Sequence, residues 1–285
     1  MRTPGSISRN GISWVVVAGA ALWVASFAGL LITSPSGTRI SSDTAAQPVA
    51  YWVTLMPVAV GIALALLLPH PLPRRPVAID ARRPFLMTTI GLVVLAVLFP
   101  VLTVVVPLVG ESYVLGKLTL FMIVPAILLI VVRKSVRITW RKDASRWWAP
   151  AVVVLVWTLL SQIAPWNPVF DSARSDPSLI LTAAIATAIT AGVGEELFYR
   201  RWLQTRLEAA LGAWPGIVVA SLAFALMHLG SHGSGAPVLD VARVIVIQGS
   251  FGMFVGVMWW RYRNLTAIIL IHIISNGWAV AAVLL

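Results

Sequence analysis

Long apolar runs separated by short polar segments make up the sequence from end to end. A helix of about 20 apolar residues crosses the hydrocarbon core of a bilayer, so runs of this length predict membrane-spanning helices. The pattern predicts an all-α fold, a polytopic membrane bundle of about eight or nine transmembrane helices. The predicted spans lie near residues 12–32, 50–69, 85–108, 114–132, 147–163, 178–198, 214–229, 238–260 and 265–285.

The composition leads to the same class of protein. Of the 285 residues, 59% are hydrophobic and 11% are charged, and the mean hydropathy is +0.91. A chain of this length and composition cannot present a water-facing surface, so an integral membrane protein surrounded by lipid is expected. The first apolar run is too long for a secretory signal and no small-x-small cleavage site follows it, so we expect a retained helix. The absence of cysteine excludes disulfides, thiolate catalysis and cysteine-bound metal.

The net charge of +11 reflects the orientation of the helices. With a cytoplasmic amino terminus, 17 of the 21 Lys and Arg residues belong to cytoplasmic segments, and four belong to the opposite side. Those four are Arg39, Lys117, Arg174 and Arg243. Cytoplasmic loops of membrane proteins carry such an excess of positive charge, so no nucleic-acid partner is needed to explain it. The sequence predicts a protein of the bacterial plasma membrane with its amino terminus in the cytoplasm and its carboxyl terminus outside.

A basic stretch at residues 133–146 divides the chain into two regions. We expect residues 1–146 to form amino-terminal scaffold helices and residues 147–285 to form the transmembrane core that carries the function. The intramembrane polar residues of the core fall within 178–280. Ionisable groups inside membrane segments are expensive and usually functional, so this region is the candidate site.

The first polar pattern lies at the end of the sixth predicted span. Glu195 and Glu196 follow Gly194, and Arg200 comes four residues after Glu196. Residues four apart share one face of a helix, so Glu196 and Arg200 can pair and leave Glu195 turned elsewhere and free. Two further pairs have the same spacing in later apolar runs: Phe224 with His228, and His272 with Asn276.

The spacing brings the polar residues to similar depths. A turn near Gly212 predicts a hairpin in which Glu195 lies 17 residues before the turn and His228 lies 16 residues after it. At 1.5 Å per residue, both lie about 25 Å from the bend. His272 lies eight residues after Asn264, about 12 Å into the last helix. These depths agree if the hairpin tip protrudes about 13 Å into the cytoplasm, which the polar residues of 201–208 would permit.

The three patterns together resemble the CPBP family, which includes the type II CAAX prenyl endopeptidases and the bacterial Abi proteins. The family motifs are EExxxR, FxxxH and HxxxN or HxxxD, and the resemblance covers about residues 178–280. The matching residues are Glu195, Glu196 and Arg200, then Phe224 and His228, then His272 and Asn276.

The resemblance implies an intramembrane endopeptidase that hydrolyses a membrane-associated protein or peptide substrate. Glu195 and His228 would activate water, because a carboxylate that faces an imidazole can take up a proton from a water molecule held between them. His272 and Asn276 would stabilise the oxyanion of the tetrahedral intermediate. In supporting roles, Arg200 would hold Glu196, and Phe224 would form a wall of the cavity.

A metal-dependent mechanism is an open alternative to this glutamic type. Glu195, His228 and His272 match the protein ligands of a catalytic zinc site that leaves one position for water. However, the sequence contains no HExxH pattern, and a glutamate that binds metal would require a separate base. We favour water activation that requires no cofactor, with zinc as the alternative.

Two other classes of function also bury such groups. A proton-coupled transporter would place Glu, His and Arg in the membrane, but would normally show broken helices or repeat symmetry. A non-catalytic immunity or scaffold protein could keep the same fold without using the site. In both cases the buried charges would have a role other than hydrolysis.

Overall fold

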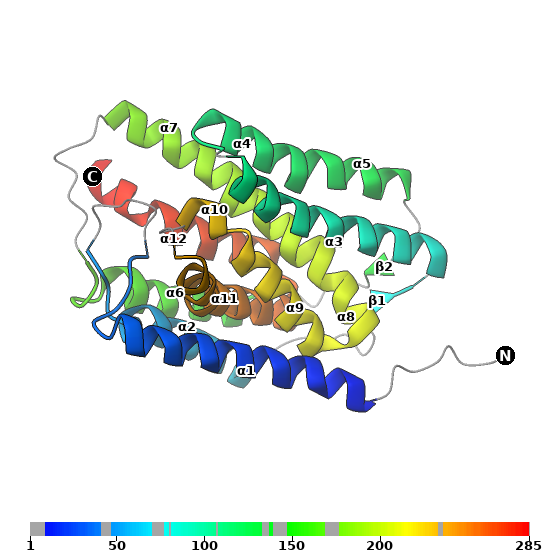
Figure 1. The fold of residues 1–285 in the computed structure, drawn as a ribbon, viewed down its shortest axis with the longest axis horizontal. Helices are drawn as coiled ribbons and strands as arrows, with labels where there is room; N and C mark the ends of the chain where they lie inside the picture. The colour runs from blue at the N-terminus through cyan, green and yellow to red at the C-terminus, as the bar shows by residue number, and fades with distance from the viewer. Residues whose placement is uncertain are drawn as a thin grey trace.

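A computed structural model describes residues 9–40, 47–69, 77–79, 81–106, 108–132, 137–138, 147–168, 177–232 and 236–284. These residues form a helical bundle with one small pair of strands, β1 (Val77–Ala78) and β2 (Arg137–Ile138) (Figure 1). The amino-terminal helices are α1 (Arg9–Thr33), α2 (Tyr51–Leu67), α3 (Arg82–Val105), α4 (Glu111–Lys117), η1 (Leu118–Ile123) and α5 (Val124–Val131). The later helices are α6 (Trp148–Thr158), η3 (Leu159–Ile163), α7 (Pro177–Thr187), η4 (Ala188–Gln204), α8 (Thr205–Leu211), α9 (Ala213–Leu226), α10 (Leu229–His232), α11 (Pro237–Tyr262) and α12 (Leu265–Leu284). The η segments are π-helical.

The helical class of the fold is confirmed, because each predicted span coincides with a helical stretch of the described chain. By length and composition, six of these stretches can cross a membrane, and three apolar helices are shorter. The three shorter ones are Tyr51–Leu67, Trp148–Ile163 and Leu265–Trp278. The total of about eight or nine transmembrane helices therefore stays a prediction.

The sixth span is longer than its hydropathy indicated. Helix continues without a break from Ser178 to Leu211, whereas the apolar run ends near residue 198. The polar residues beyond that point are not an exposed tip as predicted, because Gln204, Arg206 and Glu208 are buried. They bind neighbouring helices instead of water: Gln204 donates to the Gly256 carbonyl of α11, and Arg206 donates to Thr88 of α3.

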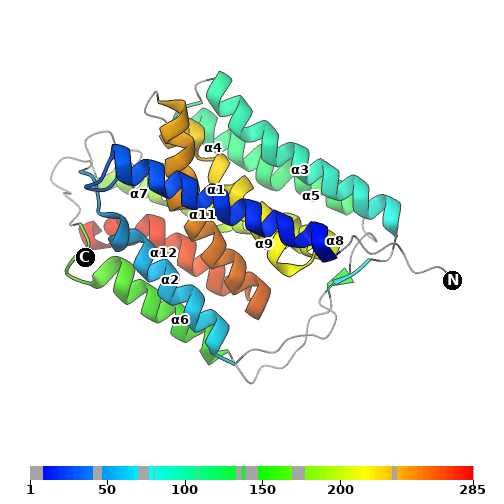
Figure 2. The same ribbon diagram turned by 60° about the horizontal axis from the view of Figure 1, so that its bottom comes forward.

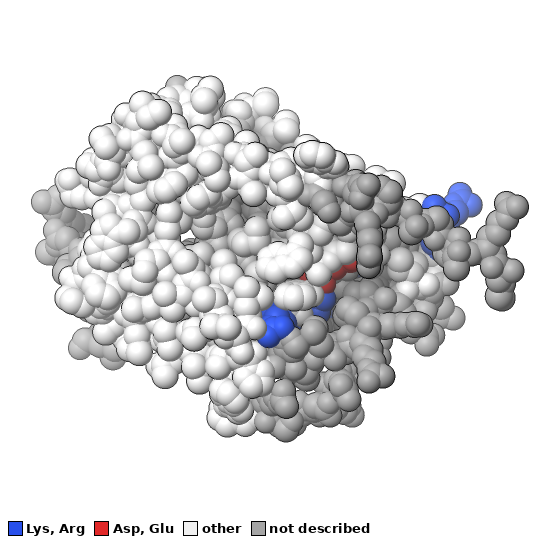
Figure 3. All heavy atoms as spheres, turned by 90° about the horizontal axis from the view of Figure 1, so that it is seen from below, with Lys and Arg blue, Asp and Glu red and all other residues white. Residues whose placement is uncertain are grey.

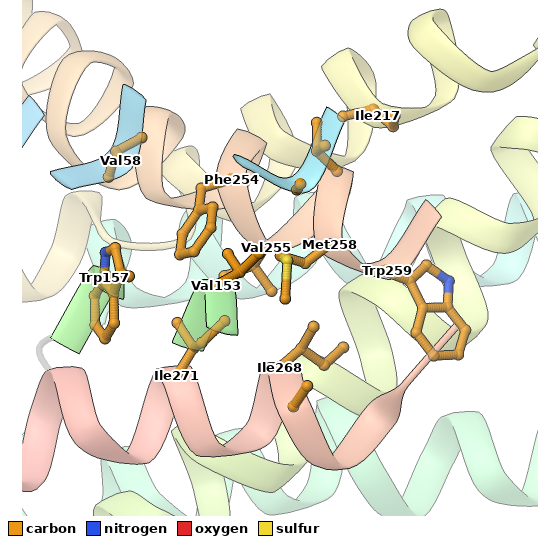
Figure 4. Close-up of a cluster of buried hydrophobic side chains, with 13 residues drawn as sticks. Val58, Val153, Trp157, Ile217, Phe254, Val255, Met258, Trp259, Ile268 and Ile271 are labelled. Carbon is orange, nitrogen blue, oxygen red and sulfur yellow. The ribbon is translucent and has the colours of Figure 1, made fainter. Parts of the chain in front are cut away.

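The centre of the bundle is α11, which packs against α1, α2 and α9. In the most apolar 18-residue stretch of α11, 72% is buried, whereas 6% of the corresponding stretch of α1 is buried. Figure 2 shows α11 between a group formed by α2, α6 and α12 and a group formed by α3 and α5. A cluster of buried apolar side chains around α11 is drawn in Figure 4, where Phe254 lies near Trp157 of α6 and Ile271 of α12.

The outward faces of the peripheral helices are apolar. Trp14 of α1, Val105 of α3 and Val131 of α5 are large apolar residues with exposed side chains. Uncharged residues predominate on the face shown in Figure 3, and few charged side chains reach it. Contiguous exposed apolar surface of this kind marks contact with lipid, which agrees with an integral membrane protein.

The segments predicted to share the cytoplasmic side lie at one end of the bundle. The β1–β2 pair joins the segments that follow α2 and α5, and β1 contacts α8. Arg263, after α11, forms an ion pair with Glu208 of α8. In Figure 1, α1 begins at this end and α12 ends at the opposite one. Most of the predicted boundary at 133–146 lies outside the described residues.

The predicted hairpin is present, and two glycines shape its turn. Gly212 separates α8 from α9 with a φ of +92°, a left-handed conformation that favours glycine. A Cβ atom on Gly216 would lie 2.6 Å from the backbone nitrogen of Glu208. The absence of a side chain at Gly216 therefore allows α9 to fold back closely along α8.

We predict that Gly216→Ala lowers the melting temperature of the detergent-purified protein. The new Cβ would collide with backbone atoms of α8, which cannot move aside as a flexible side chain can. The matched control is Gly29→Ala in α1, where a Cβ would meet nothing within 4 Å. If the two variants have equal melting temperatures in a thermal-shift assay, the close approach of α8 and α9 does not limit stability.

Candidate active site

The first motif lies on η4, a π-helix of 17 residues. π-helices are rare, bond residue i to i+5, and are frequent at functional sites. Two glycines of this helix permit close neighbours: a Cβ on Gly192 would lie 2.5 Å from Ile273 of α12, and one on Gly194 would lie 3.2 Å from Met122 of η1. Both η1 and α12 therefore approach η4 next to its acidic residues.

Glu196 forms contacts on two sides. Its Oε2 lies 3.4 Å from Nε of Arg200, which is the ion pair expected from the sequence. Its Oε1 lies 2.6 Å from Nδ1 of His272. Because a carboxylate only accepts hydrogen bonds, Nδ1 of His272 donates to Glu196. This contact fixes the imidazole ring so that its Nε2 faces Glu195.

Glu195 is fully buried and, contrary to the prediction, it is paired. Its Oε1 lies 2.5 Å from Nζ of Lys117, at the end of α4. Its Oε2 lies 3.8 Å from Nε2 of His272 and makes no hydrogen bond within the described part of the protein. The two oxygens therefore differ: one is held by an ammonium group, and the other faces an imidazole.

His228 and Phe224 complete the cluster from the side of α9. Nδ1 of His228 lies 2.9 Å from the carbonyl oxygen of Phe224, to which it can donate, and His228 is close enough to Glu195 to interact with it electrostatically. The ring of Phe224 lies 4.9 Å from that of His228 and 5.9 Å from that of His272. The Arg200 guanidinium lies 4.8 Å from the same ring. Phe224 thus lies beside His228, His272 and Arg200.

Asn276 is placed differently from its motif partner. His272 is buried with 4% of its surface exposed, whereas Asn276, four residues later on α12, is exposed. The polar cluster described above is therefore formed by Lys117, Glu195, Glu196, Arg200, Phe224, His228 and His272.

Lys117 is the residue that the sequence analysis missed. It was counted among the charges of the outer side, but its side chain lies in the interior and contacts Glu195. Arg200 and Arg206, counted on the cytoplasmic side, are also buried. A signal for Lys117 was present, because it is a cation within an apolar run, and such residues are usually paired inside membrane proteins.

The donor set fits a zinc ion poorly. In the described parts of the chain, no group of three His, Asp or Glu side chains is arranged to hold a metal. The Lys117 ammonium already binds Glu195, and a second cation at that carboxylate would be repelled.

Comparison with known protein families gives a match in the carboxyl-terminal part of the chain. Residues 177–278 match the family described as type II CAAX prenyl endopeptidase Rce1-like. This part of the chain, 102 of the 285 residues, is similar to the CAAX protease family. The Rce1-like segment contains all three motifs and ends in α12, and it excludes Lys117. The family consists of peptidases of the CAAX type, which act on membrane-associated proteins. Comparisons with curated proteins and with solved structures give no match.

We predict that Arg200→Met in the Rce1-like segment destabilises the fold. The change leaves the buried Glu196 carboxylate without its cation, and breaking a buried ion pair costs about 3–5 kcal/mol. Because His272 still contacts Glu196, we expect the lower end, about 3 kcal/mol. Denaturant unfolding of the protein in detergent measures the free-energy change.

The control is Arg201→Met, which removes a half-buried cation from the next position of the same helix. We expect it to cost less than 1 kcal/mol, as is usual for a partly exposed charge. Equal losses for the two variants would contradict a specific role of the Arg200–Glu196 pair.

Proposed function

We propose that this protein is an intramembrane endopeptidase that hydrolyses a peptide bond of a membrane-associated protein without a cofactor. The observation that supports this most strongly is the buried pair of Glu195 and His272 inside the Rce1-like segment. Oε2 of Glu195 and Nε2 of His272 face each other at 3.8 Å. A carboxylate and an imidazole at this separation can both bind a reacting water or a peptide oxygen.

In the proposed mechanism, Glu195 acts as the general base. Its Oε2 would accept a proton from water while the water oxygen attacks the peptide carbonyl, and His228 would assist through its position beside Glu195. The proton then passes to the departing amine as the carbon–nitrogen bond breaks. Because Phe224 and the neighbouring aromatic side chains exclude bulk water, electrostatic interactions within the cluster are stronger than in solution.

His272 would stabilise the negative charge on the carbonyl oxygen. Its Nδ1 donates to Glu196, and its ring lies between the carboxylates of Glu195 and Glu196. In its doubly protonated form, the ring could also donate through Nε2 to an oxyanion. Asn276 is exposed and lies one turn further along α12. It would reach the same oxygen only in the substrate complex, because catalytic hydrogen bonds often form or shorten when the substrate binds.

A non-catalytic membrane scaffold is the second candidate, and the Lys117 contact is the observation that favours it. Glu195 is balanced by Lys117, and Glu196 is balanced by Arg200. A charge-balanced buried network can serve to fix helix packing alone. A peptidase needs Glu195 to cleave its substrate, whereas a scaffold does not cleave any substrate.

For the orientation, we propose that the end of the bundle carrying α8 and the β1–β2 pair faces the cytoplasm of a bacterial cell. The chain contains no cysteine, so labelling of a single introduced cysteine shows which side of the membrane that position faces. Ser36 and Thr266 are both exposed, and they lie after α1 and at the start of α12. We predict that a membrane-impermeant maleimide added to intact cells labels Ser36→Cys and not Thr266→Cys. Labelling of Thr266→Cys alone would reverse the proposed orientation.

We predict that Glu195→Gln abolishes proteolysis. The amide keeps the shape of the carboxylate but cannot accept the proton of water, so kcat should fall by about 10²-fold or more. Quantitative proteomics of membranes from cells that carry either form would show a terminal fragment that disappears in the variant and thereby identify the substrate.

The matched control is Glu111→Gln, which changes an exposed acid at the start of α4 and should leave the fragment unchanged. Persistence of every fragment in the Glu195→Gln cells would contradict the peptidase and favour the scaffold. Activity that is lost with a chelator and restored by zinc would contradict the cofactor-free mechanism.

A further inference from the structure

Lys117 lies outside the Rce1-like segment and yet contacts the proposed base. The family match begins at residue 177, whereas Lys117 ends α4 in the amino-terminal part of the chain. Only 7% of its surface is exposed, and its ammonium contacts Oε1 of Glu195. The ring of Tyr113, one turn earlier on α4, lies 4.9 Å from the same ammonium.

The packing of η1 against η4 holds Lys117 next to Glu195. At Leu118 the helix changes from α to π, and the ring of Phe121 in η1 lies 4.8 Å from Phe198 and 5.4 Å from Tyr199 of η4. Aromatic pairs at these distances are attractive beyond their burial of area. The close approach of Met122 to Gly194 adds a second contact between η1 and η4. The lysine is therefore held against Glu195 by contacts other than the ion pair.

The contact has a geometric consequence for the carboxylate. A carboxylate can rotate about its terminal bond, and an ammonium that is hydrogen-bonded to one oxygen restricts this rotation. With Oε1 bound to Lys117, the other oxygen, Oε2, is the one that faces Nε2 of His272. The lysine thus holds the carboxylate in an orientation that points one oxygen toward the reacting groups.

We propose that Lys117 is a positioning residue of the active site, supplied by the amino-terminal helices to hold Oε1 of Glu195 and direct Oε2 toward His272. This inference rests on the proposed peptidase function. It implies that the Rce1-like segment is not a complete site, because the cation that fixes its base comes from α4.

A double-mutant cycle on melting temperature tests the contact independently of activity. Lys117→Met and Glu195→Gln each remove one partner of a buried ion pair, so each should lower the melting temperature. The double variant leaves no unpaired charge, so its loss should be clearly smaller than the sum of the two single losses. Additive losses would overturn the contact, whether or not the chain is an enzyme.

Kinetics of the full-length protein in detergent test the positioning role. The probe is a fluorogenic peptide that spans the cleavage site found with the Glu195→Gln variant. Lys117→Met should lower kcat by about tenfold or more with KM changed less than about threefold, because substrate binding does not require the lysine. Lys117→Arg, which keeps a cation, should recover much of the loss.

The matched control is Arg206→Met, which removes another cation with 7% exposure, on α8, that donates to Thr88 and not to Glu195. Its kcat, measured per folded molecule, should equal that of the unchanged protein. An unchanged kcat in Lys117→Met, together with an inactive Glu195→Gln, would overturn the positioning role and leave the peptidase in place. If Glu195→Gln cleaves the probe as fast as the unchanged protein, the proposed role of Glu195 as the base fails, and the inference about Lys117 fails with it.

Discussion

The balance of four buried charges is the constraint on which the rest of the site depends. Glu195, Glu196 and Arg200 are fully buried in one π-helix, and Lys117 comes from another helix to meet them. An isolated charge in so apolar an interior costs several kcal/mol, so each acid must keep its cation. The positions of η1 and η4 are therefore coupled, and His272 links α12 to the same network through Glu196.

Two glycines of η4 allow the network to form. Glycine at positions 192 and 194 of η4 removes the side chains that would hold Ile273 and Met122 away. The backbones of η1, η4 and α12 can then approach closely enough for short ion pairs, a use of small residues that is common in membrane bundles. A second polar cluster, in which Glu208 contacts Gln204 and Arg263, extends the same principle to the end of the bundle.

The sequence predicted the helices well and the contacts between distant helices poorly, and the membership of the site stays a prediction. Hydrophobic runs located the long apolar helices of the described residues, because a helix needs about 20 apolar residues to cross a bilayer. The hairpin arithmetic brought Glu195 and His228 into one cluster because rise per residue and turn position suffice for adjacent helices. Lys117 could not be placed in this way, because several helices, including α5, α6 and α7, separate α4 from η4 in the sequence. The spacing of residues within one segment does not indicate which distant helices are in contact.

The burial of residues 201–208 was misjudged for a related reason. A polar stretch at the end of an apolar run is expected to face water, but Gln204, Arg206 and Glu208 have partners on α11, α3 and the segment after α11. The division at residue 146 likewise applies to the sequence alone. In the structure, the two regions meet where Lys117 contacts Glu195. A segment with all the motif residues of its family can therefore still depend on the other half of the chain, because a buried acid needs a cation that the motifs do not supply.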